Sequence, residues 1–474
     1  MKILFVEPPK DFWFLMGEYL PPPLGILVLA AYLEAHVENV EIEVLDCQAE
    51  RMTWKGLEKY VESSNPGIVA PSSVATCNAY EVLRTLEIAK RVKPEVTTVV
   101  GGQHFTATAQ ESLEAYPEID IIIRGEGEKT LTEVVKALER NKPLSNVKGV
   151  SFRSNGKIVH NPSMPLIENL DDLPFPGYHF VEGNMKKYHF TMMAGANTGY
   201  ALIEGSRGCF HRCTFCSQWG HWCGIWRAKT VKRVVDEMEY CYREYGSKFL
   251  WLTDDNLSLG GRTKELCDEI VKRGLADKIM WFAQVRCDDI INNKEALPSM
   301  RKAGCLWVLT GLESHNPDTL ESFNKRIKPS DAKEAISLLG ENDIFAQATF
   351  IIGGRKDTHE SIEELRNFAN EVDPDIAFFM ILTPFPGTEL YESAKRNGWI
   401  EDANLAHYDM AHAIMPTESL TRRELQEEFY ECYRSFYGSV NRRLRGFFST
   451  NRLKRRTYRY LASQGLLKAL RKLF

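Results

Sequence analysis

The chain lacks any long apolar run. No stretch of its 474 residues is apolar over the length that a membrane-spanning helix needs. We also expect no signal peptide at its start, because Met1-Lys2-Ile3-Leu4-Phe5-Val6 has the pattern of a buried strand. With 44% hydrophobic and 26% charged residues, the chain can bury large cores and has the length of two or three domains. We therefore expect a folded protein of the cytoplasm.

Acidic side chains are absent from the last 34 residues, which contain eleven Lys or Arg. The preceding residues carry 48 Lys or Arg against 64 Asp or Glu, a net charge of −16. Near the end, apolar and basic residues at helical spacing predict an amphipathic surface helix: Leu466, Leu470, Leu473 and Phe474 with Lys468, Arg471 and Lys472. Such a tail can contact an anionic surface or partner, or it can pack on the acidic body. No recognition motif accompanies it, so we expect no nucleic-acid binding.

A fourth cysteine is missing from the motif that most limits the chemistry. Cys209, Cys213 and Cys216 stand in Gly-Cys-Phe-His-Arg-Cys-Thr-Phe-Cys, a CxxxCxxC spacing that brings three thiolates from one loop to one centre. A structural zinc site and a typical four-iron electron carrier each use four protein ligands. Three ligands therefore predict a metal centre that binds a substrate or cofactor at its open position. The eight other cysteines, without a secretory signal, favour a reducing compartment.

Short β-rich runs alternate with helical patterns over the first 140 residues. Strands are predicted at residues 2–7, 41–46, 67–71, 97–101 and 120–124, with helices near 24–34, 53–63, 78–90, 108–116 and 129–140. This order predicts a doubly wound parallel sheet, which binds ligands beyond the carboxyl ends of its strands. The loops at those ends are small and polar: Pro71-Ser72-Ser73, Gly101-Gly102-Gln103-His104 and Arg124-Gly125-Glu126-Gly127-Glu128.

A connecting segment separates this sheet from a second β/α region. Asn155-Gly156 predicts a tight hairpin between residues 149–153 and 157–160, and a proline-rich stretch at 171–177 predicts an extended crossing. From residue 200, strands are predicted at 201–203, 249–253, 280–285, 306–311, 345–352 and 375–382. Six β/α units predict a partial (β/α)6 barrel with its chemistry at the carboxyl ends of the strands. We predict domains at 1–145, 146–195 (linker and hairpin), 196–400 and 401–474, the last helical and basic.

The cysteine spacing and the polar strand ends resemble those of the radical S-adenosylmethionine (SAM) enzymes. The resemblance implies a four-iron four-sulfur cluster on the three cysteines, with SAM chelating the open iron. It implies that Arg286 holds the SAM carboxylate, that Asp254, Gln284 and Glu313 hold its ribose or amino group, and that Phe215, Gly353 and Gly354 lie near its adenine. For Arg286 and Glu313, a local ion pair that stabilises the barrel mouth remains an alternative.

The three loops of the first sheet resemble the cobalamin-binding domain of one class of radical SAM enzymes, and Thr383-Pro384-Phe385-Pro386-Gly387-Thr388 resembles a segment of the same class. The resemblance implies cobalamin binding by the small loop residues: Ser72, Ser73, Gly101, Gly102, Gln103, His104, Gly125, Glu126 and Gly127. Glu7-Pro8-Pro9-Lys10 stands where the classical domain has Asp-x-His-x-x-Gly, so that loop supplies no histidine to cobalt. His104 is a candidate ligand or a hydrogen-bonding loop residue.

The resemblance implies a C-methyltransferase. Such an enzyme removes hydrogen from an unactivated carbon with a 5′-deoxyadenosyl radical and adds a methyl group from methylcobalamin. Two alternatives remain open: an oxidative cyclase similar to the anaerobic magnesium-protoporphyrin monomethyl ester cyclase, and a cobalamin-binding sensor without turnover, which the intact cysteine triad disfavours. The expected partners are an organic, peptide or protein substrate and a ferredoxin or flavodoxin as electron donor. The sequence does not specify the substrate.

Overall fold

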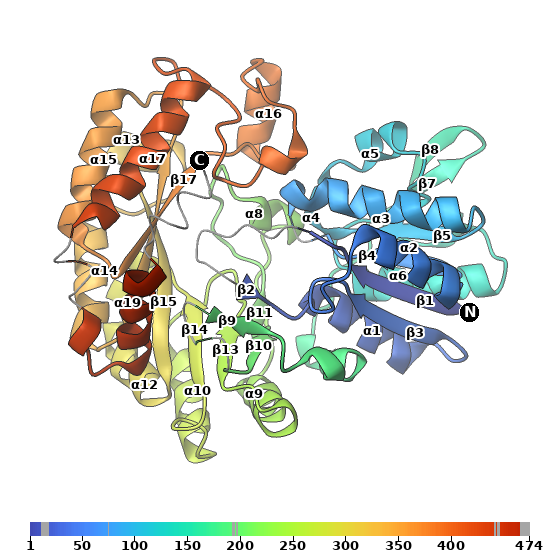
Figure 1. The fold of residues 1–474 in the computed structure, drawn as a ribbon, viewed down its shortest axis with the longest axis horizontal. Helices are drawn as coiled ribbons and strands as arrows, with labels where there is room; N and C mark the ends of the chain where they lie inside the picture. The colour runs from blue at the N-terminus through green and yellow to red at the C-terminus, as the bar shows by residue number, and fades with distance from the viewer. Residues whose placement is uncertain are drawn as a thin grey trace.

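Two α/β parts lie side by side in the computed structural model, which describes residues 1–10, 19–73, 75–191, 195, 198–439, 442 and 446–464 (Figure 1). The N-terminal part contains one sheet between two layers of helices. The second part is an open barrel whose outer surface is covered by helices. This is the predicted architecture.

The first sheet has seven strands in the order β3-β1-β4-β5-β6-β7-β8. The five parallel strands differ from the predicted ones by at most one residue at either end: β1 (Lys2–Glu7), β3 (Glu41–Asp46), β4 (Ile68–Pro71), β5 (Thr97–Val100) and β6 (Ile121–Ile123). An antiparallel hairpin, β7 (Val150–Ser154) and β8 (Lys157–His160), extends the sheet. Asn155 and Gly156 form its turn with φ angles of 50° and 73°, as Asn-Gly turns require.

Helices cover both faces of this sheet. One face packs against α1 (Leu24–His36) and α6 (Gly127–Glu139), and the other against α2 (Trp54–Ser64), α3 (Ala79–Val92) and α5 (Ala109–Ala115). The sequence missed one short helix, α4 (Gly102–Ala107), which begins inside the predicted Gly101–Gly102 loop. Gly102 has φ +81°, and a Cβ there would lie 2.4 Å from the carbonyl oxygen of Ser73, so only glycine fits this start. Gln103 and His104 consequently lie on a helix.

The second sheet has six parallel strands in the order β10-β13-β14-β15-β16-β17. Its strands are β10 (Tyr200–Ile203), β13 (Phe249–Leu252), β14 (Met280–Gln284), β15 (Cys305–Glu313), β16 (Phe345–Ile352) and β17 (Ile376–Ile381). Its helices are α9 (Val231–Tyr245), α10 (Gly261–Lys272), α11 (Cys287–Asn292), α12 (Leu297–Lys302), α13 (Pro317–Ser322), α14 (Pro329–Glu341), α15 (His359–Val372), α16 (Glu389–Arg396) and α17 (Arg422–Gly438). Because β10 and β17 are not paired with each other, the barrel stays open.

Short elements join these parts. The ribbon β2 (Tyr19–Leu20) and β9 (His189–Phe190) connects the first domain to the barrel, and β11 (Ser206–Arg207) pairs with β12 (Arg227–Ala228) beside the cysteine loop, which contains α8 (Ser217–His221). The 3-10 turns are η1 (Thr76–Asn78), η2 (Leu144–Asn146), η3 (Leu170–Asp172), η4 (Tyr178–Asn184), η5 (Lys294–Ala296), η6 (Leu405–His407) and η7 (Gly446–Phe448).

The base of the barrel is packed with aromatic side chains. Its buried cluster includes Tyr200, Phe249, Phe282, Trp307 and Phe345. Leu453 and Tyr458 of the C-terminal helix α19 (Arg452–Gln464) belong to the same cluster. This end of the barrel is therefore closed, and only the carboxyl ends of its strands remain for a binding site.

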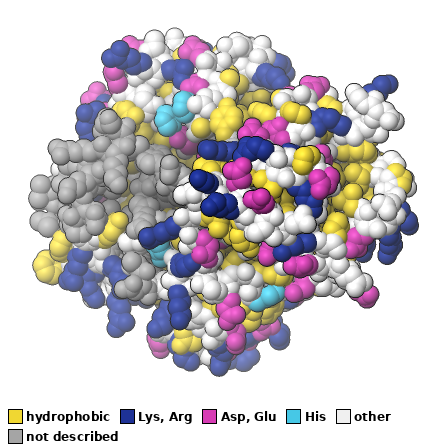
Figure 2. All heavy atoms as spheres, turned by 45° about the vertical axis from the view of Figure 1, so that its right-hand side comes forward, with side chains coloured by type: hydrophobic (Ala, Val, Ile, Leu, Met, Phe, Trp, Pro, Cys, Tyr) yellow, Lys and Arg dark blue, Asp and Glu magenta, His cyan; other side chains and the backbone are white. Residues whose placement is uncertain are grey.

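The C-terminal region is helical, as predicted, but the amphipathic helix predicted around Leu466–Phe474 lies outside the described residues. On the face drawn in Figure 2, Lys and Arg side chains are interspersed with Asp and Glu. None of the described helices is long and apolar enough to cross a membrane.

Tyrosine hydroxyls cover both open edges of the barrel. Tyr178 of η4 donates to the carbonyl of Leu202 at 2.7 Å and accepts from its N–H at 3.2 Å. The Tyr433 hydroxyl of α17 donates to the carbonyl of Phe379 at 3.0 Å and accepts from its N–H at 3.2 Å, and the Tyr437 hydroxyl makes the same two bonds to Ala377 at 2.9 and 3.2 Å. Three tyrosine hydroxyls therefore bind the backbone of the edge strands β10 and β17. Each hydroxyl makes the hydrogen bonds that a neighbouring strand would otherwise make, because a buried backbone N–H or C=O without a partner lowers the stability of the fold.

We expect Tyr433→Phe to lower the free energy of unfolding by about 1–3 kcal/mol, because the N–H and C=O of Phe379 would be left buried without a partner. Urea denaturation measures the change. The matched control is Tyr242→Phe, because among the described residues the hydroxyl of this half-buried tyrosine of α9 makes no hydrogen bond to β10 or β17. Equal stability of Tyr433→Phe and the unmodified protein would contradict the edge role.

Candidate functional site

The cysteine loop is held by a glycine that no other residue can replace. Gly208 has φ +88°, and a Cβ there would lie 2.1 Å from the carbonyl oxygen of Ile225. Its N–H donates to Asp255 at 3.1 Å. The loop is thus fixed directly before Cys209, at the carboxyl end of the barrel.

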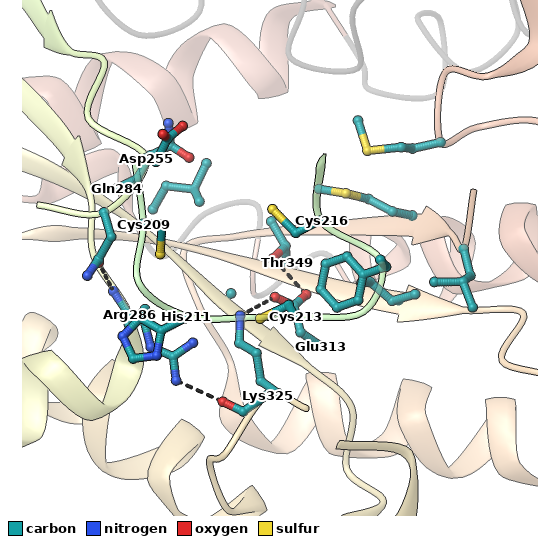
Figure 3. A pocket seen from close by; sticks show the side chains of 18 of the residues that line it. Cys209, His211, Cys213, Cys216, Asp255, Gln284, Arg286, Glu313, Lys325 and Thr349 are labelled. Atoms are coloured by element: carbon teal, nitrogen blue, oxygen red, sulfur yellow. Dashed lines mark hydrogen bonds and ion pairs between the residues drawn. The ribbon is translucent and has the colours of Figure 1, made fainter. Parts of the chain in front are cut away.

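The three cysteines of the motif line one cavity of about 300 Å³. Their sulfur atoms surround a common space (Figure 3). Among the described residues, no three His, Cys, Asp or Glu side chains are close enough to share a single metal ion. A cluster in which each thiolate binds a different iron fits this wider arrangement. Burial raises the pKa of Cys216 to about 12 and also raises that of Cys209, and iron would displace these protons.

Four of the seven residues predicted to bind SAM line this cavity with the cysteines: Phe215, Gln284, Arg286 and Glu313. Asp254 does not. It is 0% exposed, accepts hydrogen bonds from the Gly205 N–H at 3.0 Å and from the Ser206 hydroxyl, and its pKa is raised to about 6 by burial. The neighbouring Asp255 lines the cavity instead, and burial raises its pKa to about 7.

Gly353 and Gly354 also lie outside the residues that line this cavity. Both N–H groups donate to one carboxylate oxygen of Asp357, at 2.8 and 2.9 Å. Gly353 has φ +88° and fits against Leu425 of α17. Their positions show a structural turn after β16 and give no support to an adenine contact.

Lys325 is the main cavity residue that the sequence did not indicate. Its ammonium group lies 2.6 Å from Glu313, which also accepts a hydrogen bond from the Thr349 hydroxyl at 3.2 Å (Figure 3). Glu313 has φ +63°, an unfavourable backbone conformation for this residue type that occurs often at functional sites. A Cβ at Gly311 would lie 2.2 Å from the Glu313 carboxylate, so the ion pair of Glu313 and Lys325 needs a glycine at this position.

Arg286 is held rigidly in the same cavity. Its guanidinium binds the Asp288 carboxylate at 2.9 and 3.0 Å and donates to the carbonyl of Lys325 at 2.8 Å. Both Arg286 and Glu313 therefore form the local ion pairs that the sequence left open, and both also line the cavity. Only the fold could reveal Lys325, because it lies on an irregular loop between Asn324 and Arg326, which have φ angles of 50° and 57°.

A larger cavity of about 610 Å³ lies between the carboxyl ends of the first sheet and the wall of the barrel. Seven of the nine residues predicted to bind cobalamin line it: Ser72, Ser73, Gly101, Gly102, Gly125, Glu126 and Gly127. Gly102 and Gly125 have positive φ angles, and no protein atom lies within 4 Å of where a Gly125 Cβ would be. These loops leave backbone surface open to a large ligand, which fits cobalamin.

Gln103 and His104 do not line this cavity. Gln103 bridges the two domains, donating to Gln218 at 2.7 Å and accepting from Ser217 at 2.7 Å. His104 is 4% exposed and packs edge to face on Phe105 at 5.0 Å, and burial lowers its pKa to about 4. This placement in the core gives no support to His104 as a cobalt ligand.

A buried cluster of charges joins the two domains. Arg207 donates to Glu126 at 2.9 Å and Glu128 at 2.7 Å from the first domain and, at 3.0 Å, to Glu204, which lies between β10 and β11. Arg227 also binds Glu126, at 2.9 Å. The Arg207 side chain is only 5% exposed. Because Arg207 stands two residues before Cys209, this cluster fixes the cysteine loop against the Gly125–Gly127 loop.

The two cavities meet. Asp255 and Gln284 line both of them, at the ends of β13 and β14. Figure 3 shows their side chains together on the wall that also carries Cys209. A ligand at this wall would face both the cysteine cavity and the larger cavity.

We expect Arg207→Ala to lower the free energy of unfolding by about 3–5 kcal/mol, because the buried Glu128 carboxylate and the partly buried Glu204 carboxylate would lose their ion-pair partner and Glu126 would keep only Arg227. Urea denaturation again provides the measurement. Arg423→Ala serves as control, since its ion pair with Glu427 is exposed and should contribute about 0–1 kcal/mol. A loss no larger than that of the control would show that the cluster is not what joins the domains.

Comparison with protein families assigns both parts of the chain. The B12 binding domain family matches residues 17–135, and the radical SAM superfamily matches residues 203–369. Among solved structures, the radical SAM methyltransferase TsrM of Kitasatospora setae, with cobalamin and a [4Fe-4S] cluster bound, has a TM-score of 0.73 at 18% identity, covering 99% of each chain. The cobalamin-dependent SAM radical enzyme OxsB has a TM-score of 0.74 at 17% identity, covering 99% of this chain and 72% of its own.

Sequence similarity to known proteins extends over most of the chain. An uncharacterized methyltransferase of Pyrococcus horikoshii is 32% identical over 440 residues, 92% of each chain. The anaerobic magnesium-protoporphyrin IX monomethyl ester cyclase of Cereibacter sphaeroides is 33% identical, covering 92% of this chain and 70% of its own. The hopanoid C-3 methylase of Methylococcus capsulatus is 26% identical, covering 88% and 76%. The chain therefore belongs to the radical SAM enzymes that carry an N-terminal cobalamin-binding domain.

Proposed function

We propose that this chain is a cobalamin-dependent radical SAM C-methyltransferase that methylates an unactivated carbon. The observation that carries the proposal is the wall shared by Asp255 and Gln284, since a substrate held there can reach both cofactors. The bound cofactors supply the radical that removes hydrogen and the methyl group that replaces it. The protein's part is to hold, orient and enclose these groups.

The residues of the smaller cavity divide this work. We assign the cluster to Cys209, Cys213 and Cys216, and the SAM carboxylate to the guanidinium of Arg286. Glu313, fixed by Lys325, can accept hydrogen bonds from the ribose hydroxyls. Phe215 offers an apolar ring for the adenine. Asp255 replaces Asp254 in our assignment of the amino-group contact, because it is the aspartate that lines the cavity.

We assign cobalamin to the larger cavity. Ser72, Ser73 and the glycines of the two following loops can bind it through backbone amides and small side chains. Glu126 contributes differently, because its carboxylate is already bonded to Arg207 and Arg227 and can only support the loop. The cofactor would thus rest on the same loop that orients the cysteines.

A second candidate function is oxidative cyclisation without methyl transfer. The 33% identity to the magnesium-protoporphyrin cyclase favours it as much as the 32% identity to the methyltransferase favours ours. The residues that bind the cofactors do not separate the two. The products do, because only methyl transfer consumes a second SAM.

We expect reduced, reconstituted enzyme with its substrate to form S-adenosylhomocysteine together with 5′-deoxyadenosine. A cyclase would form only 5′-deoxyadenosine, and a sensor would form neither. Cys213→Ala should abolish both products while cobalamin binding, measured by absorbance, persists. Cys223→Ala, an exposed cysteine of the same loop outside the motif, is the control and should retain both. Turnover without S-adenosylhomocysteine would exclude the methyltransferase.

The partners and location follow from the same chemistry. Cluster reduction needs an external donor, for which we propose a ferredoxin or flavodoxin. We place the enzyme in the cytoplasm, because the eleven cysteines are all free thiols and an exposed cluster requires a reducing compartment. For the basic tail we propose contact with an anionic surface.

We expect deletion of residues 465–474 to weaken binding to anionic phospholipid vesicles, because it removes the interleaved Leu and Lys or Arg residues. Co-sedimentation measures the binding, and neutral vesicles are the control. The deletion spares α19, whose Leu453 and Tyr458 pack in the barrel base. Unchanged binding after deletion would remove the reason for a membrane role of the tail.

A further inference from the structure

The segment of residues 322–326, at the end of α13, is bonded to the cysteine loop. Three hydrogen bonds join the two: the Thr214 N–H donates to the Phe323 carbonyl at 3.1 Å, the Thr214 hydroxyl to the Ser322 carbonyl at 3.1 Å, and the Asn324 side chain to the Arg212 carbonyl at 2.6 Å. Arg212 and Thr214 are the neighbours of Cys213 in sequence. The segment is therefore fixed relative to this one cysteine.

Lys325 reaches from this segment into the cysteine cavity. It stands between two residues with φ angles of 50° and 57°. Its N–H donates to the Leu320 carbonyl at 2.9 Å, and its carbonyl accepts from Arg286 at 2.8 Å. Lys325 and Cys213 line the same cavity. The backbone of Lys325 is thus held on both sides, and its side chain has a defined place near the cysteines.

The Lys325 ammonium has more hydrogen-bond donors than the protein satisfies. The side chain is only 9% exposed, and an ammonium carries three N–H bonds. Among the described residues, its one acceptor is an oxygen of Glu313 at 2.6 Å, and the other Glu313 oxygen accepts from the Thr349 hydroxyl at 3.2 Å. Buried donors without a partner are costly, so the two remaining N–H bonds need acceptors from a group bound in the cavity.

The charge of Lys325 also acts on Cys213. Burial lowers the pKa of Lys325, but the charges of Glu313 and Cys213 raise it by more, so the ammonium keeps its proton. Figure 3 shows the Lys325 nitrogen beside Glu313, with Cys213 on the same side of the cavity. A charged donor thus stands on the side of the cavity where Cys213 would hold its iron.

We infer that Lys325 makes the cluster easier to reduce: its two remaining N–H groups bind sulfur of the cluster near Cys213, and its charge stabilises the electron that the cluster gains. That electron comes from the external one-electron donor, no bond is broken, and Lys325 keeps its proton. Hydrogen bonds to the sulfurs and the charges around them set the potential of such clusters. The inference rests on our assignment of the cluster to the three cysteines. It goes beyond the proposed function, because methyl transfer and cyclisation both begin with a reduced cluster.

The test is the reduction potential of the reconstituted cluster without SAM, followed by electron paramagnetic resonance during a redox titration. Glu313→Gln is compared with the double variant Lys325→Met/Glu313→Gln. Both lack the carboxylate, so they differ only in the ammonium, and no buried carboxylate loses its partner. We expect the double variant to have a potential at least about 59 mV more negative, which is a tenfold smaller equilibrium constant for one-electron reduction. Equal potentials would overturn the inference.

Two further variants in the Glu313→Gln background connect the shift to the charge and position of Lys325. Lys325→Arg keeps the charge, and its potential should lie closer to that of Glu313→Gln than to that of the double variant. Lys328→Met removes an exposed lysine three residues along, which does not line the cavity, and should leave the potential unchanged. An equal shift in Lys328→Met would contradict a local effect. If iron analysis shows no cluster in the double variant, Lys325→Gln/Glu313→Gln, whose two amides can bond to each other, takes its place in the comparison.

SAM binding separates this role from a role in holding SAM. If the double variant binds SAM less tightly than Glu313→Gln while the two potentials without SAM are equal, Lys325 serves SAM alone and the inference is wrong. If the unmodified protein assembles no cluster, the assignment to the three cysteines fails, and the inference fails with it. If the cluster assembles and the potentials are equal, the proposed function stands and only this inference is wrong.

Discussion

The structure depends on one buried guanidinium. Arg207 comes from the barrel and is bonded to Glu126 and Glu128 of the cobalamin domain and to Glu204 of its own domain. The deeply buried carboxylates of Glu126 and Glu128 need a counter-charge, which the barrel supplies through Arg207 and, for Glu126, also through Arg227. The contact fixes the distance between the cysteine loop and the glycine loops. Both cavities, and the wall they share, exist because the two domains meet in this one orientation.

Much of the fold could be predicted because local patterns determine it. Parallel strands buried on both faces are continuous apolar runs, and β1, β4 and β16 appear in the structure within two residues of the predicted limits. The cysteine motif could also be recognised from the sequence, because its three cysteines lie within eight residues of one another. Likewise, Asn155-Gly156 predicts its turn without knowledge of the rest.

The residues whose placement differs from the sequence-based expectation lie where the local pattern ends. Asp254 and Asp255 follow the last residue of β13, where the alternation of faces no longer holds, and the structure turns Asp255, not Asp254, to the cavity. His104 looked like a loop residue, but Gly102 begins a helix that carries it into the core. Lys325 belongs to no strand end, and only the return of an irregular loop brings it to Glu313. Such positions depend on tertiary contacts that one sequence does not display.

The tyrosines on the barrel edges have a consequence for how the enzyme can change. The edge strand of a sheet has unpaired N–H and C=O groups, to which another strand can bind unless the edge is blocked or covered. Here Leu202, Phe379 and Ala377 are already bonded to hydroxyls, so further strands cannot complete the ring. The width of the gap between the edge strands β10 and β17 therefore depends on the positions of η4 and α17, which cover these edges, and not on the number of strands. A shift of these two covering segments would change the gap and leave the hydrogen bonding between the six strands as it is.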